Sequence, residues 1–272
     1  MPIWQAVILG ILQGLTEFLP VSSSAHLAVL PYLVGWKDHG LAFDVALHFG
    51  TLLAVLGYFF RDWLQILAQG FGMKAGSDET LRQNPNLLWM LVLATLPAGI
   101  IGLLFEKQAE AAGNNLYMIG FWSITMGLLM AWADRTGSQR NDLSHISMGD
   151  SLTIGAAQAL AVMPGVSRSG ITMTAGLAKG LDRYAAARFS FLLSTPIIAG
   201  AALKNFYDMY KTGLDPDMRT AFAVGIAVSA LTGALTIRYF MEFLRRRSLR
   251  FFVSYRVVFG VAVIILAIVR SS

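Results

Sequence analysis

The sequence contains no cysteine, so the chain can form no disulfide bond, no thiolate metal site and no thiol nucleophile. It also has few charged residues, since Asp, Glu, Lys and Arg make up 14% of the chain, compared with about 25% in soluble domains. Apolar residues make up 56%, and the mean hydropathy is +0.59. The composition therefore argues against a water-soluble enzyme and predicts an integral membrane protein.

A continuous basic surface is also missing. The formal net charge of +5 is the surplus that basic cytoplasmic loops give to membrane proteins, and no basic face of useful length lies outside such loops. We therefore expect no nucleic-acid partner. At about 20 residues per membrane span, 272 residues leave no room for a separate soluble domain, so we expect one polytopic domain over residues 1–272. Residues 1–19 lack a basic leader and a cleavage site and are expected to belong to the mature fold.

Six apolar stretches are long enough to cross a bilayer as helices: 42–60, 86–105, 115–132, 185–203, 219–238 and 251–269. Two further apolar stretches, 3–35 and 151–180, are interrupted by the polar sequences Pro-Val-Ser-Ser-Ser (20–24) and Pro-Gly-Val-Ser-Arg-Ser-Gly (164–170). Unpaired backbone at membrane depth is tolerated only where it is buried in protein or lines a wet cavity. We therefore predict that each is a re-entrant helix hairpin with a polar tip.

The two broken segments resemble each other. Gln13 precedes Pro20 as Gln158 precedes Pro164, with an offset of about 145 residues. Each half of the chain, about 1–135 and 145–272, then holds one hairpin and three full spans. Because three is an odd number of crossings, the second half must be inverted relative to the first. The predicted fold is thus an all-α membrane protein with an inverted-topology repeat, whose two tips enter from opposite faces and meet near the midplane.

The basic residues divide unequally between the two faces of this predicted topology. The richer face should be cytoplasmic, which would place both termini outside. It holds Arg61, Lys74, Arg82, Arg135, Arg140, Lys179, Arg183, Arg245, Arg246, Arg247 and Arg250, whereas the other face holds Lys37, Lys107, Lys204, Lys211, Arg219 and Arg270.

The first tip carries the densest group of polar residues inside an apolar segment. Gln13 and Glu17 are four residues apart, on one helix face that leads into the serine tip, and His26 follows it. Polar groups at membrane depth are costly unless paired, so each is a functional candidate. The alternative is a helix end capped by serines, with Glu17 paired to a lysine.

The second tip supplies the complementary charge. Arg168 lies between Ser167 and Ser169, and the backbone N–H groups that begin the next helix point into the same loop, which is the usual construction of a phosphate site. The alternative is that Arg168 neutralises Glu17 as a structural pair. The sequence lacks G-x-S-x-G, H-E-x-x-H and G-x-x-x-x-G-K-S motifs, so the enzyme classes that they mark are excluded.

Two further pairs of polar residues lie outside the two tips. Asp44 and His48 are four residues apart near the start of a span, where they either support the site from a second layer or form a helix-end pair. His39 and His145 lie in polar loops, where we expect them to be solvated.

At the two tips the sequence resembles the bacitracin-resistance family of membrane undecaprenyl-pyrophosphate phosphatases. The family's motif of Glu or Gln, three residues and Glu matches residues 13–17, and its Pro-Gly-x-Ser-Arg-Ser-x-x-Thr motif matches residues 164–172. The match covers essentially the whole chain. The resemblance implies hydrolysis of undecaprenyl pyrophosphate to the monophosphate carrier of peptidoglycan synthesis, with resistance to bacitracin, in the bacterial inner membrane.

The resemblance also implies roles for individual residues and a divalent cation, Mg²⁺ or Ca²⁺. Glu17 is the expected cation ligand, with Gln13 as a weak one, because an amide binds metal less strongly than the carboxylate of other members. The expected catalytic residues are Glu17, Ser23, His26 and Arg168, and the expected substrate-binding residues are Ser22, Ser24, Ser167, Arg168, Ser169 and Thr172.

Several alternatives stay open at this point. The nucleophile is Ser23 activated by His26 or Glu17, His26 itself, or an activated water, with a slight preference for Ser23 or water. A polyprenyl-phosphate flippase or secondary transporter is the rival function, because inverted repeats with broken helices are also a transporter architecture. We expect the site to open to the outer face. The oligomeric state is open, with a homodimer among the alternatives.

Overall fold

The computed structural model describes residues 1–212 and 218–271, and within them the regular structure is helical. Six of these helices are long and apolar enough to cross a membrane, which confirms the six predicted spans. They are α3 (Leu41–Tyr58), α6 (Leu87–Leu104), α8 (Leu116–Thr136), α11 (Arg183–Thr212), α12 (Arg219–Leu244) and α13 (Arg250–Ser271).

The two interrupted segments are broken helices, as predicted. In the first, α1 (Ile3–Phe18) and α2 (Ser23–Val34) are separated by the tip at residues 19–22. In the second, α9 (Met148–Gln158) and the 3-10 helix η1 (Ala159–Val162) precede the tip, and α10 (Arg168–Ala178) follows it. Each tip ends on a serine with positive φ, 76° at Ser22 and 71° at Ser167. A serine rarely adopts this conformation, so both turns are held by their surroundings.

Short helices lie at the ends of the long ones. α4 (Phe60–Gly70) and α5 (Glu79–Arg82) follow α3, and α7 (Glu106–Ala112) follows α6. Arg188 joins α11 to α4 and to the start of α5, because its guanidinium donates to Asp62 at 2.6 Å and to Asp78 at 2.9 Å. Arg188 is only 7% exposed, and the two carboxylates offset the free-energy cost of removing its charge from water.

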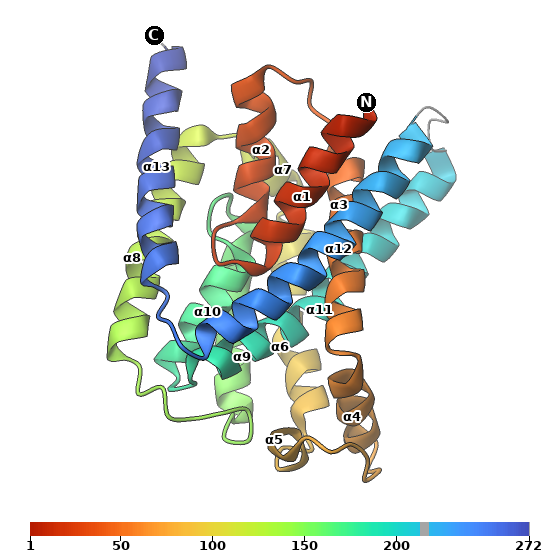
Figure 1. Ribbon diagram of the computed structural model, residues 1–272, viewed down its shortest axis with the longest axis vertical. Helices are drawn as coiled ribbons and strands as arrows, with labels where there is room; N and C mark the ends of the chain where they lie inside the picture. Colours follow the sequence, from red (N-terminus) through yellow and green to blue (C-terminus); the bar gives the residue numbers. More distant parts are fainter. Residues whose placement is uncertain (213–217, 272) are drawn as a thin grey trace.

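Both termini lie at one end of the molecule, and α4 and α5 lie at the other (Figure 1). Arginine side chains join elements near both ends. Arg183 pairs with Asp134 at 2.6 Å near one end, whereas Arg270 donates to the carbonyl of Tyr32 at 3.0 Å near the other.

The hairpins are embedded among the long helices rather than lying on the outside. α12 packs against α1 and α3, α6 packs against α9, and α10 contacts α8 and α11. Glycines allow the closest crossings: a Cβ atom on Gly10 of α1 would lie 3.0 Å from the Val228 Cβ of α12, and one on Gly155 of α9 would lie 2.6 Å from the Ala94 Cα of α6. These crossings bury the broken backbone inside protein, as the membrane requires.

Candidate active site

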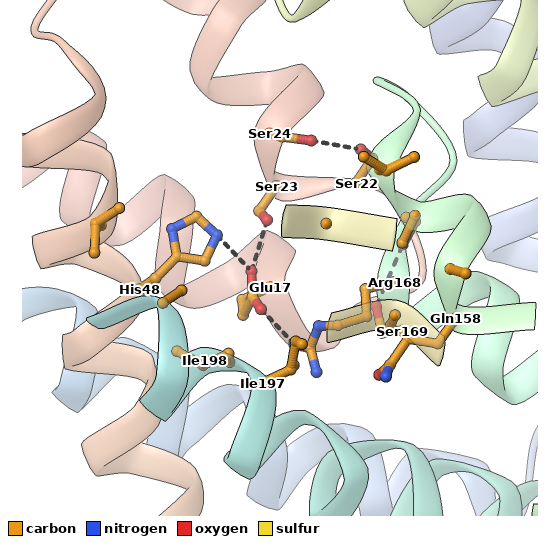
Figure 2. Close-up of a pocket in the computed structure, with 18 residues that line it drawn as sticks. Glu17, Ser22, Ser23, Ser24, His48, Gln158, Arg168, Ser169, Ile197 and Ile198 are labelled. Carbon is orange, nitrogen blue, oxygen red and sulfur yellow. Dashed lines mark hydrogen bonds and ion pairs between the residues drawn. The ribbon is translucent and has the colours of Figure 1, made fainter. Parts of the chain in front are cut away.

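The two hairpin tips meet. The carboxylate of Glu17, at the end of α1, forms an ion pair with the guanidinium of Arg168, the first residue of α10 (Figure 2). The hydroxyl of Ser169 also donates to the carbonyl of Leu19 at 3.0 Å. The prediction that residues 20–24 and 164–169 lie against each other is therefore confirmed, although 151 positions separate the paired residues.

Glu17 is the centre of a hydrogen-bond network, and the residue is only 6% exposed. Its Oε2 atom accepts hydrogen bonds from the Ser23 hydroxyl at 2.6 Å and from the Gln13 amide at 3.0 Å. The Nε2 atom of His48 lies 3.4 Å from the same oxygen. The network positions the Ser23 hydroxyl and gives the buried carboxylate hydrogen-bond partners inside an apolar fold.

Both tips end as helix N-termini beside this network. The Ser167 hydroxyl accepts a hydrogen bond from the backbone N–H of Gly170 at 3.1 Å and lies 3.3 Å from the Ser169 hydroxyl. In the first tip, the hydroxyls of Ser22 and Ser24 lie 3.3 Å apart. Two helix N-termini, a guanidinium and four hydroxyls are the donors that bind phosphate groups.

A cavity of about 340 Å³ opens between the tips and helices α3, α6 and α11. Its lining combines polar side chains from both tips and α3 with small or aliphatic residues, and Figure 2 shows Ile197 and Ile198 of α11 beside the Glu17–Arg168 pair. The lining comprises Glu17, Ser22, Ser23, Ser24, Val45, His48, Ala98, Gly102, Gln158, Ala159, Ala161, Val162, Ser167, Arg168, Ser169, Ile197, Ile198 and Ala201.

Some polar atoms beside this cavity are left without a hydrogen-bond partner among the described residues. They are the Nη1 atom of Arg168 and both polar atoms of the Gln158 side chain. A buried polar group without a partner costs about 1–3 kcal/mol. Arg168 does neutralise Glu17, as the alternative from the sequence proposed. The ion pair nevertheless leaves the Nη1 atom of the guanidinium without a partner among the described residues, so this atom could bind an anion.

The structure does not bring His26 to the other predicted catalytic residues. Its Nδ1 atom lies 2.7 Å from the carbonyl oxygen of Ser22, and its Nε2 atom lies 2.6 Å from the hydroxyl of Tyr255. The imidazole stacks on Phe259 with ring centroids 4.3 Å apart. A carbonyl oxygen can only accept a hydrogen bond, so Nδ1 carries the ring proton and donates a hydrogen bond to the Ser22 carbonyl. Nε2 then accepts a hydrogen bond from the Tyr255 hydroxyl. His26 thus holds the first tip in place, and its role as a base stays a prediction.

Thr172 also lies outside the cavity lining. It is 1% exposed, and its hydroxyl is 2.6 Å from the Ser190 hydroxyl and donates to the Arg168 carbonyl at 2.8 Å. These contacts fix the first turn of α10, which carries Arg168. A direct contact of Thr172 with substrate stays a prediction.

Asp44 and His48 separate into different environments. His48 lies in the site beside Glu17, whereas the Asp44 carboxylate bonds to the imidazole of His39 at 2.6 Å. The expectation that His39 is solvated is wrong, because its side chain is only 4% exposed. Burial lowers the pKa of His39, but the hydrogen bond and the negative charge of Asp44 outweigh it, so the pKa is raised overall. His145, by contrast, is exposed, as expected.

Arg256 of α13 is a residue that the sequence analysis missed. It is 1% exposed and joins the two tips through backbone carbonyls, donating to Pro20 at 3.1 Å, Gly165 at 2.7 Å and Val166 at 3.1 Å. The same guanidinium donates to Ser123 of α8 at 3.2 Å. An arginine inside the apolar stretch 251–269 was the available signal, since a charged residue there is a functional candidate.

A second cavity, of about 660 Å³, adjoins the first and shares Ser24, Val45 and His48 with it. Its other lining residues come from α2, the segment 36–44, α7, the loop at Gly113 and Asn114, and the first residue of α8, Leu116. These elements lie toward the end that holds both termini (Figure 1). The site therefore opens toward that end of the molecule.

The residues around Glu17 fit a divalent cation only with help from the substrate. No group of three or more His, Cys, Asp or Glu residues that could hold a metal occurs in residues 1–212 and 218–271. Glu17 offers one carboxylate, and the Oε1 atom of Gln13 is an acceptor without a partner in the described structure. One carboxylate completed by substrate phosphates and water is a common arrangement for Mg²⁺.

The fold and the site together define a polytopic membrane protein with a buried polar centre between two broken helices. The family model described as bacitracin resistance protein BacA matches residues 6–262, and the chain belongs to this family.

Several relatives match this chain over nearly their full length. A protein of Pelotomaculum thermopropionicum is 48% identical over 100% of this chain and 99% of its own length, and it is named undecaprenyl-diphosphatase. Proteins with the same name from Desulforudis audaxviator and Moorella thermoacetica are 46% and 45% identical, over 98% and 97% of this chain and 99% and 97% of their own lengths.

Proposed function

We propose that this protein is an undecaprenyl-diphosphatase, which hydrolyses undecaprenyl pyrophosphate to undecaprenyl phosphate and inorganic phosphate. The observation that carries the proposal is the meeting of Glu17, Ser23 and Arg168 between two helix N-termini beside an apolar-walled cavity. The polar lining residues suit a diphosphate, and the small and aliphatic ones suit a polyprenyl chain. The name of the relatives supports the same substrate. The product re-enters cell-wall synthesis, and recycling the carrier confers bacitracin resistance.

Phosphoryl transfer needs an in-line nucleophile, neutralisation of the phosphate oxygens and a stabilised leaving group. Arg168, Ser167, Ser169 and the N-terminus of α10 bind the diphosphate. Ser23 is the nucleophile in this proposal, because its hydroxyl already donates to Glu17 at 2.6 Å. The Ser23 oxygen bonds to the terminal phosphorus while its proton passes to Glu17, and the bond from that phosphorus to the bridging oxygen breaks. Glu17 passes this proton to the departing lipid phosphate and is again ionised. Water then attacks the phosphoserine and gives a proton to Glu17, which returns it to the Ser23 oxygen as the bond from that oxygen to phosphorus breaks and inorganic phosphate is released.

A bound divalent cation, Mg²⁺ or Ca²⁺, would neutralise charge on the diphosphate oxygens, with Glu17 and more weakly Gln13 as its protein ligands. His48, whose Nε2 atom lies 3.4 Å from the Glu17 carboxylate, would help to position that carboxylate. His26 would act through the tip that it holds.

The rival function is that of a flippase or secondary transporter. A carrier needs to bind its ligand but has no use for a serine hydroxyl aligned on a buried carboxylate. The Ser23–Glu17 hydrogen bond therefore favours hydrolysis. Flipping of the product by the same protein is compatible with this chemistry.

We infer that the chain is an inverted-topology repeat of two halves. Three pairs of features support it: the positive-φ serines Ser22 and Ser167, the crossings of α1 on α12 and of α9 on α6, and their glycines Gly10 and Gly155. Both pairs of residues are 145 positions apart, which is the offset in the sequence.

The proposed location is the bacterial inner membrane with both termini outside. The end with α4 and α5 carries the denser basic residues and would face the cytoplasm. The second cavity would then open the site to the outer face. A homodimer stays a prediction from the sequence.

The test is phosphate release from undecaprenyl pyrophosphate by the detergent-purified protein, with and without a chelator. Ser23→Ala should lose at least about 100-fold in turnover. The matched control is Ser194→Ala, which should keep most of the turnover, because the buried Ser194 hydroxyl donates to the Phe191 carbonyl outside the cavity lining. Acid quenching of the wild type should trap a phosphoserine at position 23. Absence of phosphate release would refute the function, and turnover by Ser23→Ala without a phosphoenzyme would assign the attack to water.

A further inference from the structure

Gln158 is the last residue of α9, directly before η1 and the second tip. The residue is 2% exposed and lines the cavity that holds Arg168 and Glu17. In Figure 2 its carboxamide end extends on the same side of the cavity as the guanidinium of Arg168. Neither its Nε2 nor its Oε1 atom has a hydrogen-bond partner in the described part of the chain.

Other buried glutamines in the fold do have partners. Gln65 is 3% exposed, and its carboxamide donates to the Asp78 carbonyl at 2.8 Å and accepts from the Asp78 N–H at 3.1 Å. Gln13, the counterpart of Gln158 in the first hairpin, donates to Glu17 at 3.0 Å. Gln158 therefore differs from Gln13 and Gln65, because both its donor and its acceptor lack a partner in the described structure. A buried amide in this state is a candidate for binding a ligand.

We propose that Gln158 binds the lipid-side phosphate of the substrate, the phosphate that leaves with the polyprenyl chain. This inference rests on the proposed hydrolysis of a polyprenyl diphosphate. The terminal phosphate must lie at Ser23 and Glu17, which belong to the first hairpin. Gln158 belongs to the second hairpin, and three residues of η1 that follow it are part of the apolar lining of the cavity: Ala159, Ala161 and Val162. The phosphate next to Gln158 is thus the one nearer the hydrocarbon.

The chemistry of the leaving group fits this placement. When the bridging bond breaks, negative charge develops on the lipid monophosphate, and a preorganised N–H donor in a water-poor site stabilises it. The Nε2 atom of Gln158 can donate to this phosphate, together with the Nη1 atom of Arg168, which also has no partner in the described structure. Gln158 would thus contribute both to binding of the substrate and to departure of the product.

The test is Gln158→Met, which keeps the side-chain length and removes both polar atoms. With farnesyl diphosphate as substrate, we expect kcat/KM to fall about 10- to 100-fold, the loss typical of one hydrogen bond to a charged group. Farnesyl monophosphate should become a weaker product inhibitor by a similar factor, while inhibition by inorganic phosphate should not change. The melting temperature should stay the same or rise, because the substitution removes an unsatisfied buried amide.

Gln65→Met is the matched control, because it replaces a buried glutamine whose hydrogen bonds are already made within the protein. It should lower the melting temperature and leave the ratio of the two inhibition constants unchanged. If Gln158→Met does not fold, Gln158→Leu is measured in the same way.

Three results would overturn the inference. They are unchanged kinetics in Gln158→Met, weaker inhibition by inorganic phosphate alone, or loss of activity that only follows a lower melting temperature. A wild-type protein that releases no phosphate from a polyprenyl diphosphate would refute the proposed function itself, so the two failures are distinguishable.

Discussion

At the residue scale, the proposed chemistry requires Arg168 to bind Glu17 and a substrate phosphate at the same time, which restricts the residues that can replace it. One guanidinium nitrogen pairs with Glu17, while Nη1 stays available to a phosphate oxygen. A lysine keeps the charge but offers a single ammonium, which cannot reach both groups in a fixed plane. Arg168→Lys should therefore lose about 100-fold or more in kcat/KM for phosphate release.

The control for this substitution is Arg183→Lys, since Arg183 pairs with Asp134 outside the cavity. That variant should keep most of its turnover. Near-normal turnover in Arg168→Lys would mean that Arg168 is only the counter-ion of Glu17.

Glu17 is the residue whose charge the proposed chemistry uses most directly. Glu17→Gln preserves the shape of the side chain but removes the acceptor for the Ser23 proton and weakens cation binding. We expect a loss of about 100-fold or more in turnover, equivalent to about 2.7 kcal/mol of transition-state stabilisation, in a protein that stays folded.

Gln13→Glu tests the same site in the opposite direction. Gln13 contacts Glu17 directly, so a second carboxylate there should raise the affinity for the cation. Turnover is to be measured against Mg²⁺ and Ca²⁺ concentration for both variants. Wild-type turnover and metal dependence in Glu17→Gln would refute the mechanism.

At the element scale, the two tips depend on α13. Arg256 donates to carbonyls of both tips, in particular those of Pro20 and Gly165, and these carbonyls would lose their partners in its absence. Arg256→Met should lower the melting temperature and abolish most turnover, because unsatisfied buried carbonyls are costly and the tips would separate. Arg256→Lys should recover only part of the stability, since one ammonium cannot span the same carbonyls. Wild-type turnover in Arg256→Met would show that the tips hold together without it.

The loop between α2 and α3 should make stability depend on pH. The pKa of His39 is raised above its ordinary value of 6.5, chiefly because its hydrogen bond to Asp44 outweighs burial. Protonated His39 thus stabilises the fold at pH values below about 6.5, and this contribution is lost as the pH rises through the raised pKa. In melting curves between about pH 5.5 and 8.5, the wild type should lose stability relative to His39→Gln as the pH rises. Parallel curves for the two proteins would contradict this coupling.

The sequence predicts the elements of this fold better than the directions of its side chains. The spans and broken hairpins are predictable because long apolar runs and polar interruptions are local features with few structural solutions in a membrane. His26 and Arg256 show what is not local. His26 turns away from Ser23 because Tyr255 and Phe259 of α13 receive its imidazole, and those residues are more than 200 positions away in the chain. Arg256 binds backbone carbonyls, which no sequence motif marks.

At the scale of the whole molecule, the orientation in the membrane can be tested by cysteine labelling, because the chain contains no cysteine of its own. A single introduced cysteine is then the sole target of a thiol reagent. We predict that Arg246→Cys, in the basic segment after α12, is labelled only when the reagent reaches the cytoplasm. Asn114→Cys is the matched probe for the opposite face, because Asn114 lines the second cavity near the end that holds both termini. In intact cells, an impermeant maleimide should modify Asn114→Cys and not Arg246→Cys, and permeabilisation should make both reactive. The reverse labelling pattern would show that the proposed topology is inverted. The second cavity would then open to the cytoplasm, whereas the proposal has it open to the outer face.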